Sequence, residues 1–537
     1  MKLKRARNPY VYASITVIVL MMVGWLFSRV LATSDNTYMR LLLLQDVVNQ
    51  VSLRYVYKIP PDQLYRLAVE GLLKNLDPYT ELIPAEEYKR FQELQVKSEY
   101  LGTGISITRT NREIVVMSTF PGSSAYREGI QPGDRIIRVD GKSTRNWTTE
   151  QASLHLLGEE GTTVEVAVSR MGVPDPLNFT LTREPVVVPT VTRHFMLPNS
   201  VGYVRLANFT ERSAEELKEC VENLLAEGIK SLILDLRDNA GGLTESAINI
   251  CNLFLSGREL IVSIRARRKE DSSSFFSKGK PVFKDQPMAV LINEFTASSS
   301  EIVAGALQDH DRAVILGKNS FGKGLVQTTF PLNSGDVLKI TTARYYTPSG
   351  RNIQRENFTR IGRLSERGTF PERTLYPAKE DSEEEPETQV VFKTDMGREV
   401  LGGGGIAPDV EVAEDSAAFD SFIVELLPHS FDFAVAYKSE HPNLDKSFRA
   451  DRKVFDAFVS LLKNKCVEVD DKKLDKHRIF ITNYLLTYRI VQVTWDDNTA
   501  YQLIAGSDQQ LNKALEILGG VKSQTEIFEK IIKEGRD

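Results

Sequence analysis

The sequence predicts a multidomain α+β protein, and three observations support this. A chain of 537 residues is too long for one hydrophobic core. Apolar residues recur at helical spacing near both ends, whereas the middle carries short β-branched runs and then alternating strands and helices. An uncharged apolar run near the N-terminus is long enough to cross a membrane. In chain order we expect an N-terminal transmembrane anchor or signal (1–33), a small helical domain (34–96), a β-rich domain (97–185), an α/β core sheet (186–415) and a helical C-terminal extension (416–537).

Composition narrows the range of partners. Hydrophobic residues make up 42% and charged residues 26% of the chain, as in ordinary globular proteins. The net charge of −5 gives no sign of the basic face that nucleic-acid phosphates require. We therefore expect no nucleic-acid partner.

The N-terminus carries an export signal. Basic residues precede an uncharged run from Asn8 to Ser28, about 21 residues, which as a helix would cross a hydrocarbon core of ~30 Å. The basic flank should stay in the cytoplasm and leave everything after Arg29 on the far side. A cleaved signal peptide, with Val30-Leu31-Ala32 as its cleavage site, and a buried helix are the alternatives. The length of the run favours an uncleaved anchor.

The elements between the anchor and residue 190 fall into two groups. Helical spacing dominates from 39 to 95, and Asp77-Pro78 should end the second helix because a residue before proline avoids the α region. In the β-rich domain we expect strands at Ile114–Met117, Arg135–Val139 and Val164–Ser169. One helix is expected there, at Thr149–Leu157.

The core sheet should follow from about residue 200. Strands are expected at Val201–Leu206, Leu232–Leu236, Ala289–Ile292 and Ala313–Leu316, with helices at Ala214–Glu227 and 300–308. Residues 352–390 read as a mobile acidic loop, and the chain beyond 416 is mainly helical, as at Val454–Leu462 and Leu511–Leu518. Active residues should lie in loops at strand ends.

A serine cluster lies at one such junction, in the segment Thr296–Glu301 between a strand and a helix. A serine there presents its hydroxyl beside the free N–H groups of the helix N-terminus, which could hold an oxyanion. The alternative is helix capping, for which Ser298, Ser299 and Ser300 compete.

A lysine between two glycines is the second candidate. Lys323 follows an apolar strand, and burial would lower its pKa from the ordinary ~10.4 so that it could act as a base. A surface lysine in a turn is the alternative. His310 lies 12 residues after Ser298, about 18 Å along a helix, so a Ser–Lys dyad is simpler than a Ser–His–Asp triad.

A glycine turn supplies the third candidate. In Asp235–Gly242 a strand runs into paired glycines, whose bare N–H groups can face a ligand as oxyanion donors. An ordinary turn is the alternative.

Six motifs in order resemble the C-terminal processing (tail-specific) peptidases: YLGTGI, PGDRIIRVDG, GYVRLANF, DLRDNAGG, TASSSEIVAGALQDH and GKNSFGKGLVQ. The likeness covers roughly residues 40–415. That family has a lysine general base 25 positions after its serine nucleophile and a glutamine four positions beyond the lysine, a spacing that Ser298, Lys323 and Gln327 match. Many members carry alanine at the position of Ser299, a difference that matters little where only a backbone N–H is used.

The resemblance implies a mechanism without a metal or an organic cofactor. Ser298 would attack the scissile carbonyl, Lys323 would move the proton, and Gln327 would orient Lys323. The amides of Gly241 and Ser299 would hold the oxyanion, with Gly242 equally eligible in place of Gly241.

Residues 97–185 resemble the PDZ domain of this family. The carboxylate-binding loop would be Tyr100-Leu101-Gly102-Thr103-Gly104-Ile105, and the strand pairing with the peptide would start with Ile105 and Ile107. The groove's other wall would be the helix around Gln151–Leu157; Ile107 and Leu154 are alternatively plain core residues. Substrates should have exposed, flexible, largely apolar C-termini, and peptide binding is expected to move the PDZ domain and complete the dyad.

We therefore expect a serine endopeptidase acting on exported proteins. It would be a single-pass protein of the bacterial inner membrane with its catalytic part in the periplasm, or secreted to the periplasm if the N-terminal segment is cleaved. Amphipathic helices at either end suggest a homodimer or an adaptor protein as partner. An exported PDZ adaptor with an inactive peptidase fold, and an enzyme acting on another acyl substrate, are the competing hypotheses.

Overall fold

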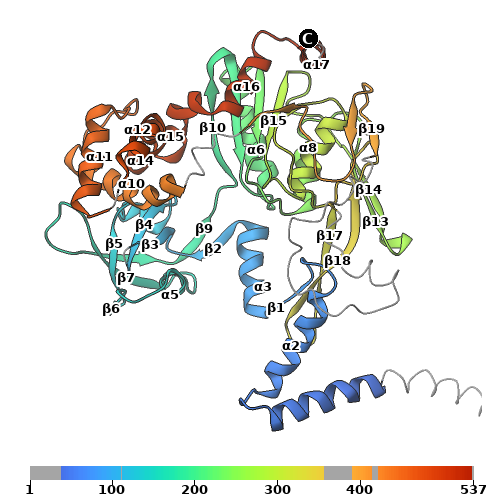
Figure 1. Cartoon of the computed structure of the whole chain (residues 1–537), viewed down its shortest axis with the longest axis horizontal. Coiled ribbons are helices and arrows are strands. Elements are labelled where there is room, and N and C mark those ends of the chain that lie inside the picture. The colour runs from blue at the N-terminus through green and yellow to red at the C-terminus, as the bar shows by residue number, and fades with distance from the viewer. Residues whose placement is uncertain (1–37, 111, 356–389, 414–420, 468, 535–537) are drawn as a thin grey trace, which may run out of the picture. The chain divides into compact units, whose positions relative to one another are not determined.

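The computed structural model describes residues 38–110, 112–355, 390–413, 421–467 and 469–534 (Figure 1). The expected anchor and most of the expected acidic loop lie outside these ranges. Within them, no helix combines the length and apolar character that a membrane span needs. The described chain forms two compact units, one ending at Leu82 and the other beginning at Ile83.

The first unit is helical, as expected. A helix covers 38–54, and α2 (Pro61–Lys74) begins with a proline at its first position, where the missing N–H costs nothing. Its last turn ends at Asn75, shortly before Asp77-Pro78. β1 (Glu81–Ile83) follows.

In the second unit a β-rich domain comes first. After α3 (Ala85–Phe91) and the π-helix η1 (Gln92–Lys97), the short strands β2 (Glu99–Gly102) and β9 (Glu184–Val187) pair at the domain's two ends. The sheet order is β3-β4-β5-β7-β8, with β6 on β5. The bounds are β3 Ile105–Thr110, β4 Glu113–Thr119, β5 Arg135–Val139, β6 Lys142–Ser143, β7 Thr163–Ser169 and β8 Leu177–Thr182, with helices α4 Ser124–Arg127 and α5 Thr149–Leu156. The expected strands and helix are confirmed to within two residues.

A mostly parallel sheet forms the core. Its order is β10-β11-β12-β15-β16-β21, and only the edge strand β10 runs antiparallel to its neighbour. The bounds are β10 Val191–Leu197, β11 Val201–Leu206, β12 Ser231–Asp235, β15 Met288–Ile292, β16 Val314–Gly317 and β21 Val410–Glu411. Because both faces of the central strands are buried, they read in the sequence as continuous apolar runs.

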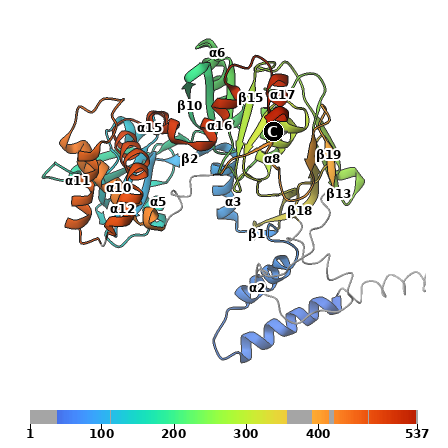
Figure 2. The same cartoon turned by 45° about the horizontal axis from the view of Figure 1, so that its top comes forward.

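Helices from distant parts of the chain cover the two faces of this sheet. One hydrophobic cluster packs α6 (Ser213–Ala226), α7 (Thr244–Cys251) and α8 (Ser299–Asp309) on one face. On the other face, a second cluster packs α15 (Asp497–Ile504), α16 (Gln509–Leu518) and α17 (Gln524–Glu534), as Figures 1 and 2 show. The end of the C-terminal extension is therefore a layer of the core.

A second, antiparallel sheet was not expected from the sequence. It contains β13 (Leu260–Ala266), β14 (Ser273–Phe276), β17 (Leu325–Pro331) and β18 (Val337–Tyr346). Most positions of β17 and β18 are half-buried or exposed, so no apolar run marks them. A separate hairpin pairs β19 (Val391–Lys393) with β20 (Glu399–Leu401).

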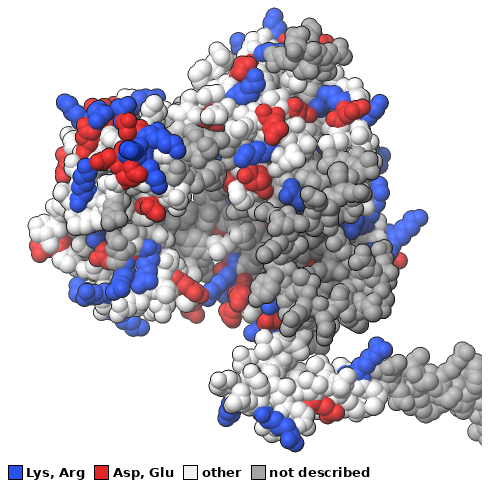
Figure 3. Space-filling view, viewed as in Figure 1, with Lys and Arg blue, Asp and Glu red and all other residues white. Residues whose placement is uncertain are grey.

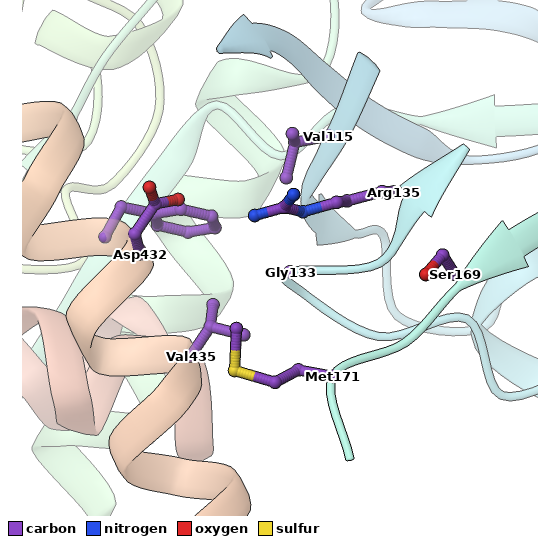
Figure 4. A pocket seen from close by; sticks show the side chains of 8 residues that line it. Val115, Gly133, Arg135, Ser169, Met171, Asp432 and Val435 are labelled. Atoms are coloured by element: carbon purple, nitrogen blue, oxygen red, sulfur yellow. The ribbon is translucent and has the colours of Figure 1, made fainter. Parts of the chain in front are cut away.

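The first part of the extension contacts the β-rich domain. It comprises α10 Ser421–Glu440, α11 Arg452–Asn464, α12 Asp471–Lys476, α13 Arg478–Phe480, the π-helix Ile481–Thr487 and α14 Tyr488–Thr494. Val115 of β4 joins the hydrophobic cluster of these helices. A pocket of about 230 Å³ lies between α10 and the strands. Figure 4 shows the side chains that line it. Its charged groups already have partners, since Arg135 pairs with Glu113 at 2.6 Å and Asp432 with Lys465 at 2.7 Å.

Candidate active site

Ser298 lies where β15 has ended and α8 begins. Its backbone has φ 58° and ψ −116°, a strained conformation that is rare outside glycine. Of the three neighbouring serines only Ser298 is partly accessible. Ser299 and Ser300 are fully buried, and their hydroxyls donate to the carbonyls of Gly242 and Asn239, each at 2.9 Å. Ser299 and Ser300 therefore hydrogen-bond the start of the helix to the glycine turn. Of the three serines, only Ser298 is accessible to a substrate.

A buried carboxyl group joins Ser298 to the lysine segment. One oxygen of Glu301 accepts the N–H of Ser298 at 2.7 Å and that of Lys323 at 2.9 Å. The other accepts the N–H of Gly322 at 2.8 Å and the hydroxyl of Ser320 at 2.5 Å. Burial raises the pKa of Glu301, and the four hydrogen bonds offset part of that rise.

Tyr345 of β18 contacts the same two residues from their carbonyl side. Its buried hydroxyl lies 3.1 Å from the Ser298 carbonyl oxygen and also hydrogen-bonds the Lys323 carbonyl oxygen. The backbones of Ser298 and Lys323 are thus neighbours, held at their amides by Glu301 and at their carbonyls by Tyr345. Sequence reasoning missed both. Glu301 had a signal, the Ser-x-x-Glu spacing of a capping box, whereas Tyr345 lies on an unexpected strand.

Lys323 is half-buried and lies between two glycines, neither of which could be replaced by a larger residue without strain or overlap. A Cβ on Gly324 would lie 2.9 Å from the backbone nitrogen of Gln354, and Gly322 has φ 87°. Gln327 follows on β17, where its amide nitrogen donates to Thr341 of β18 at 3.3 Å.

The glycine turn lies against the segment that contains Ser298. A Cβ on Gly241 would come within 2.8 Å of both the Ser298 Cβ and the Ser299 backbone nitrogen. The N–H of Gly241 donates to Asn239 Oδ1 at 2.9 Å. For the N–H groups of Gly242 and Ser299, no acceptor is found among the described residues. At this turn the N–H of Gly242 is therefore free to donate to a ligand, whereas the N–H of Gly241 is already engaged.

His310 has another role. It lies at the far end of α8, where Nδ1 is 2.7 Å from an Asp395 carboxylate oxygen and Nε2 is 2.7 Å from the Leu260 carbonyl oxygen. Burial would lower the pKa of His310, but these acceptors outweigh it and raise the pKa. Through these two contacts the ring links α8 to its neighbours.

A second candidate site lies in the β-rich domain, as a pocket of about 210 Å³ between the start of β3 and α5. It is lined by Tyr100, Thr103, Ile105, Ser153, Leu156 and Leu157, together with Arg90, Glu93 and Leu94 of the preceding helices. Sequence reasoning named Tyr100, Thr103 and Ile105, and it named the wall helix around Gln151–Leu157, where the other lining residues of this domain lie. It assigned the preceding helices to another domain.

The other expected groove residues have different positions. Leu101 and Gly102 pair with β9, and Ile107 packs partly against the domain core. Leu154, in contrast, is 46% exposed. The carbonyl of Gly104 accepts the Phe120 N–H at 3.0 Å, whereas the N–H groups of Thr103 and Gly104 have no acceptor among the described residues. The N–H of Thr103, which lines the pocket, and that of the next residue, Gly104, are thus available for an anion.

Comparison with known proteins adds independent information. Residues 200–360 match the model of peptidase family S41, and residues 92–169 match that of the PDZ domain. A carboxy-terminal-processing protease of Bartonella bacilliformis is 39% identical over 325 residues, covering 60% of this chain and 74% of the relative. The carboxy-terminal processing protease CtpA of Bacillus subtilis is 32% identical over 326 residues, covering 60% and 68%. Among solved structures, a photosystem II D1 C-terminal processing protease is 28% identical, covers 58% of this chain and 90% of its own, and gives a TM-score of 0.34.

Proposed function

The chain belongs to the carboxy-terminal-processing proteases of peptidase family S41, and is therefore a serine-type peptidase with a PDZ domain; we propose that it is an endopeptidase that binds substrate C-termini in that domain and cleaves with a Ser298–Lys323 dyad. The observation that carries the proposal is that Ser298 and Lys323 hydrogen-bond the same buried carboxylate. One carboxylate oxygen of Glu301 accepts both of their N–H groups.

In the proposed reaction Ser298 Oγ attacks the scissile carbonyl carbon while Lys323 Nζ accepts the hydroxyl proton. Lys323 then returns the proton to the leaving amine, and water repeats the sequence on the acyl-enzyme. Gln327 orients Lys323. The N–H groups of Ser299 and Gly242 hold the oxyanion, because the N–H of Gly241 is already engaged by Asn239.

The substrate's C-terminus would bind in the pocket between β3 and α5. The free N–H groups of Thr103 and Gly104 can donate to its carboxylate, and Arg90 places a positive charge at the same pocket. The last side chain would contact Ile105 and Leu156, which favours an apolar residue. A strand-like pairing of the peptide with β3 would continue the sheet.

The test is cleavage of an unfolded reporter by the purified full chain. A reporter with a free apolar C-terminus should be cleaved about tenfold or more faster than the same reporter with an amidated end, because amidation removes charge-assisted hydrogen bonds worth ~1.5–3 kcal/mol. The Ser298→Ala chain serves as the blank. Equal cleavage of both reporters would refute C-terminus recognition, and cleavage of neither would refute the endopeptidase.

We also propose that the Asn8–Ser28 run anchors the chain in the bacterial inner membrane with the catalytic part in the periplasm, and that the first unit forms a homodimer. Its exposed apolar side chains include Met39, Leu41, Leu43, Leu53 and Leu72, and its surface in Figure 3 is mostly uncharged. The full chain should need detergent for extraction and then show twice the mass of one chain by light scattering. Release by alkaline carbonate would contradict the anchor, and a single-chain mass would contradict the dimer.

A further inference from the structure

A buried ion cluster lies beneath the glycine turn. Arg237, in the segment that follows β12, is almost fully buried. Its guanidinium donates to Asp235 on one side, from Nε at 2.9 Å and from Nη2 at 2.7 Å. Asp235 also accepts the Tyr203 hydroxyl at 2.7 Å. Burial would raise the pKa of Asp235, but Arg237 and Arg205 keep it below the ordinary value.

The other side of this guanidinium contacts the C-terminal extension. Asp508, 271 residues further along the chain, accepts from Arg237 Nη1 at 3.2 Å and pairs with Nη2 at 2.9 Å. The Tyr501 hydroxyl donates to Asp508 at 2.7 Å, and Gln510 Oε1 lies 3.3 Å from Nη1. Burial raises the pKa of Tyr501, which keeps its hydroxyl protonated as a donor. Residues of the extension therefore complete the coordination of a core arginine.

Arg237 is coupled to the site through the two residues that follow it. Asp238 is fixed by two hydrogen bonds with Asn293, at 3.0 and 2.8 Å. The buried side chain of Asn239 accepts the Gly241 N–H, and its carbonyl accepts the N–H of Ala297 at 3.0 Å. A shift of Arg237 would thus move the turn that carries Gly242, next to Ser298.

The negative charge of Asp508 partly neutralises the buried guanidinium of Arg237. Removing that charge while keeping the shape would leave Nη1 of the buried guanidinium with only neutral acceptors and Nη2 with Asp235 as its one carboxylate, which is costly in a protein interior. The cation would then move toward Asp235 or admit water. Asn is as good a helix N-cap as Asp, so Asp508→Asn should preserve the start of α16, where Asp508 accepts the Leu511 N–H at 3.0 Å.

We propose that Asp508 and Tyr501 are positioning residues for the peptidase reaction, holding Arg237 and, through it, the Asp238–Gly242 turn that supplies an oxyanion donor. This inference rests on the proposed function. It also gives the end of the C-terminal extension a role in the active site beyond covering one face of the sheet.

The test compares Asp508→Asn and Tyr501→Phe with a matched control in the purified full chain. Asp409→Asn removes another carboxylate, whose side chain is only 7% exposed, which pairs with Arg398 at 2.5 Å, and which lies remote from the glycine turn along the sheet. We expect Asp508→Asn to lower kcat about tenfold with KM within about twofold, and Tyr501→Phe to lower kcat less. Asp409→Asn should lower Tm comparably yet leave kcat within about twofold. Hydrogen exchange at residues 238–242 should be faster in Asp508→Asn, faster to a lesser extent in Tyr501→Phe, and unchanged in Asp409→Asn.

The outcomes are distinguishable. Equal kcat changes in Asp508→Asn and Asp409→Asn would mean that the extension only supports folding, which overturns the inference; so would unchanged exchange at 238–242 in Asp508→Asn. If Asp508→Asn fails to fold, Tyr501→Phe, which keeps every charge, decides by the same two readouts. A wild-type chain without Ser298-dependent cleavage would refute the proposed function instead, and the exchange measurement would still decide the inference.

Discussion

A Lys323→Ala chain is expected to fold normally and to lose about 10³-fold or more in kcat, because Lys323 is the general base in the proposed mechanism and its removal would leave the Ser298 hydroxyl without a proton acceptor. The side chain contributes its amine, whereas its backbone supplies the contacts with Glu301 and Tyr345. Truncation to alanine therefore removes the base and keeps both backbone contacts.

The measurement is kcat on the unfolded reporter, with Lys318→Ala as the matched control. Lys318 lies in the same loop and pairs at 3.4 Å with the partly exposed Glu294, so its loss should leave kcat unchanged. Ethylamine should partly restore Lys323→Ala and leave Ser298→Ala inactive, since a free amine can replace a base but not a nucleophile. Lys323→Arg should stay inactive because a guanidinium does not deprotonate. A Lys323→Ala chain as active as Lys318→Ala would require another base.

Among the elements predicted from sequence, the central core strands were recognised by their uniform burial. Strands β12 and β15 are buried along their whole length, so every residue contributes to an apolar run. Strands β17 and β18 are half-exposed and carry threonines, lysine and arginine, so periodicity did not reveal them. Tyr345, on the second of these strands, was missed for that reason.

The site residues also differ in whether the sequence alone could reveal their roles. The spacing between Ser298 and Lys323 is visible along the chain, and so is the turn that contains Gly241 and Gly242. Which glycine N–H is free depends on the side chain of Asn239, which is itself oriented by the Leu206 carbonyl at 2.8 Å. Contacts of this kind, like that of Asp508 with Arg237, join residues far apart in sequence and follow from tertiary packing alone.

The turn itself gives the second large effect: Gly241→Ala is expected to lower kcat/KM about 100-fold or more. A Cβ at this position would lie 2.7 Å from the Ala297 carbonyl oxygen and 2.8 Å from both the Ser298 Cβ and the Ser299 nitrogen. Two of these atoms belong to the backbone that carries the proposed nucleophile, Ser298, and a proposed oxyanion donor, the Ser299 N–H. Relieving the overlap therefore displaces one or the other.

Backbone strain alone could also weaken such a variant, and Gly228→Ala separates the two causes. Gly228 has φ 95°, nearly the φ of 94° at Gly241, but a Cβ there would meet nothing within 4 Å. Both substitutions place alanine at a positive φ, at a cost of about 1 kcal/mol or somewhat more. Only Gly241→Ala adds an overlap, which should cost about 1–3 kcal/mol more in the free energy of unfolding.

Both variants are measured by urea unfolding and by kcat/KM on the reporter. The two measurements distinguish the effect of backbone strain from the effect of the methyl group's overlap with its neighbours. Because alanine has nearly the same φ in both, any difference between them reports the contacts of the added methyl group. Gly228→Ala should lose stability and keep the kcat/KM of the folded chain. If Gly241→Ala also kept it, the turn would lie too far from the reacting atoms to supply an oxyanion donor, and neither Gly241 nor Gly242 could have that role.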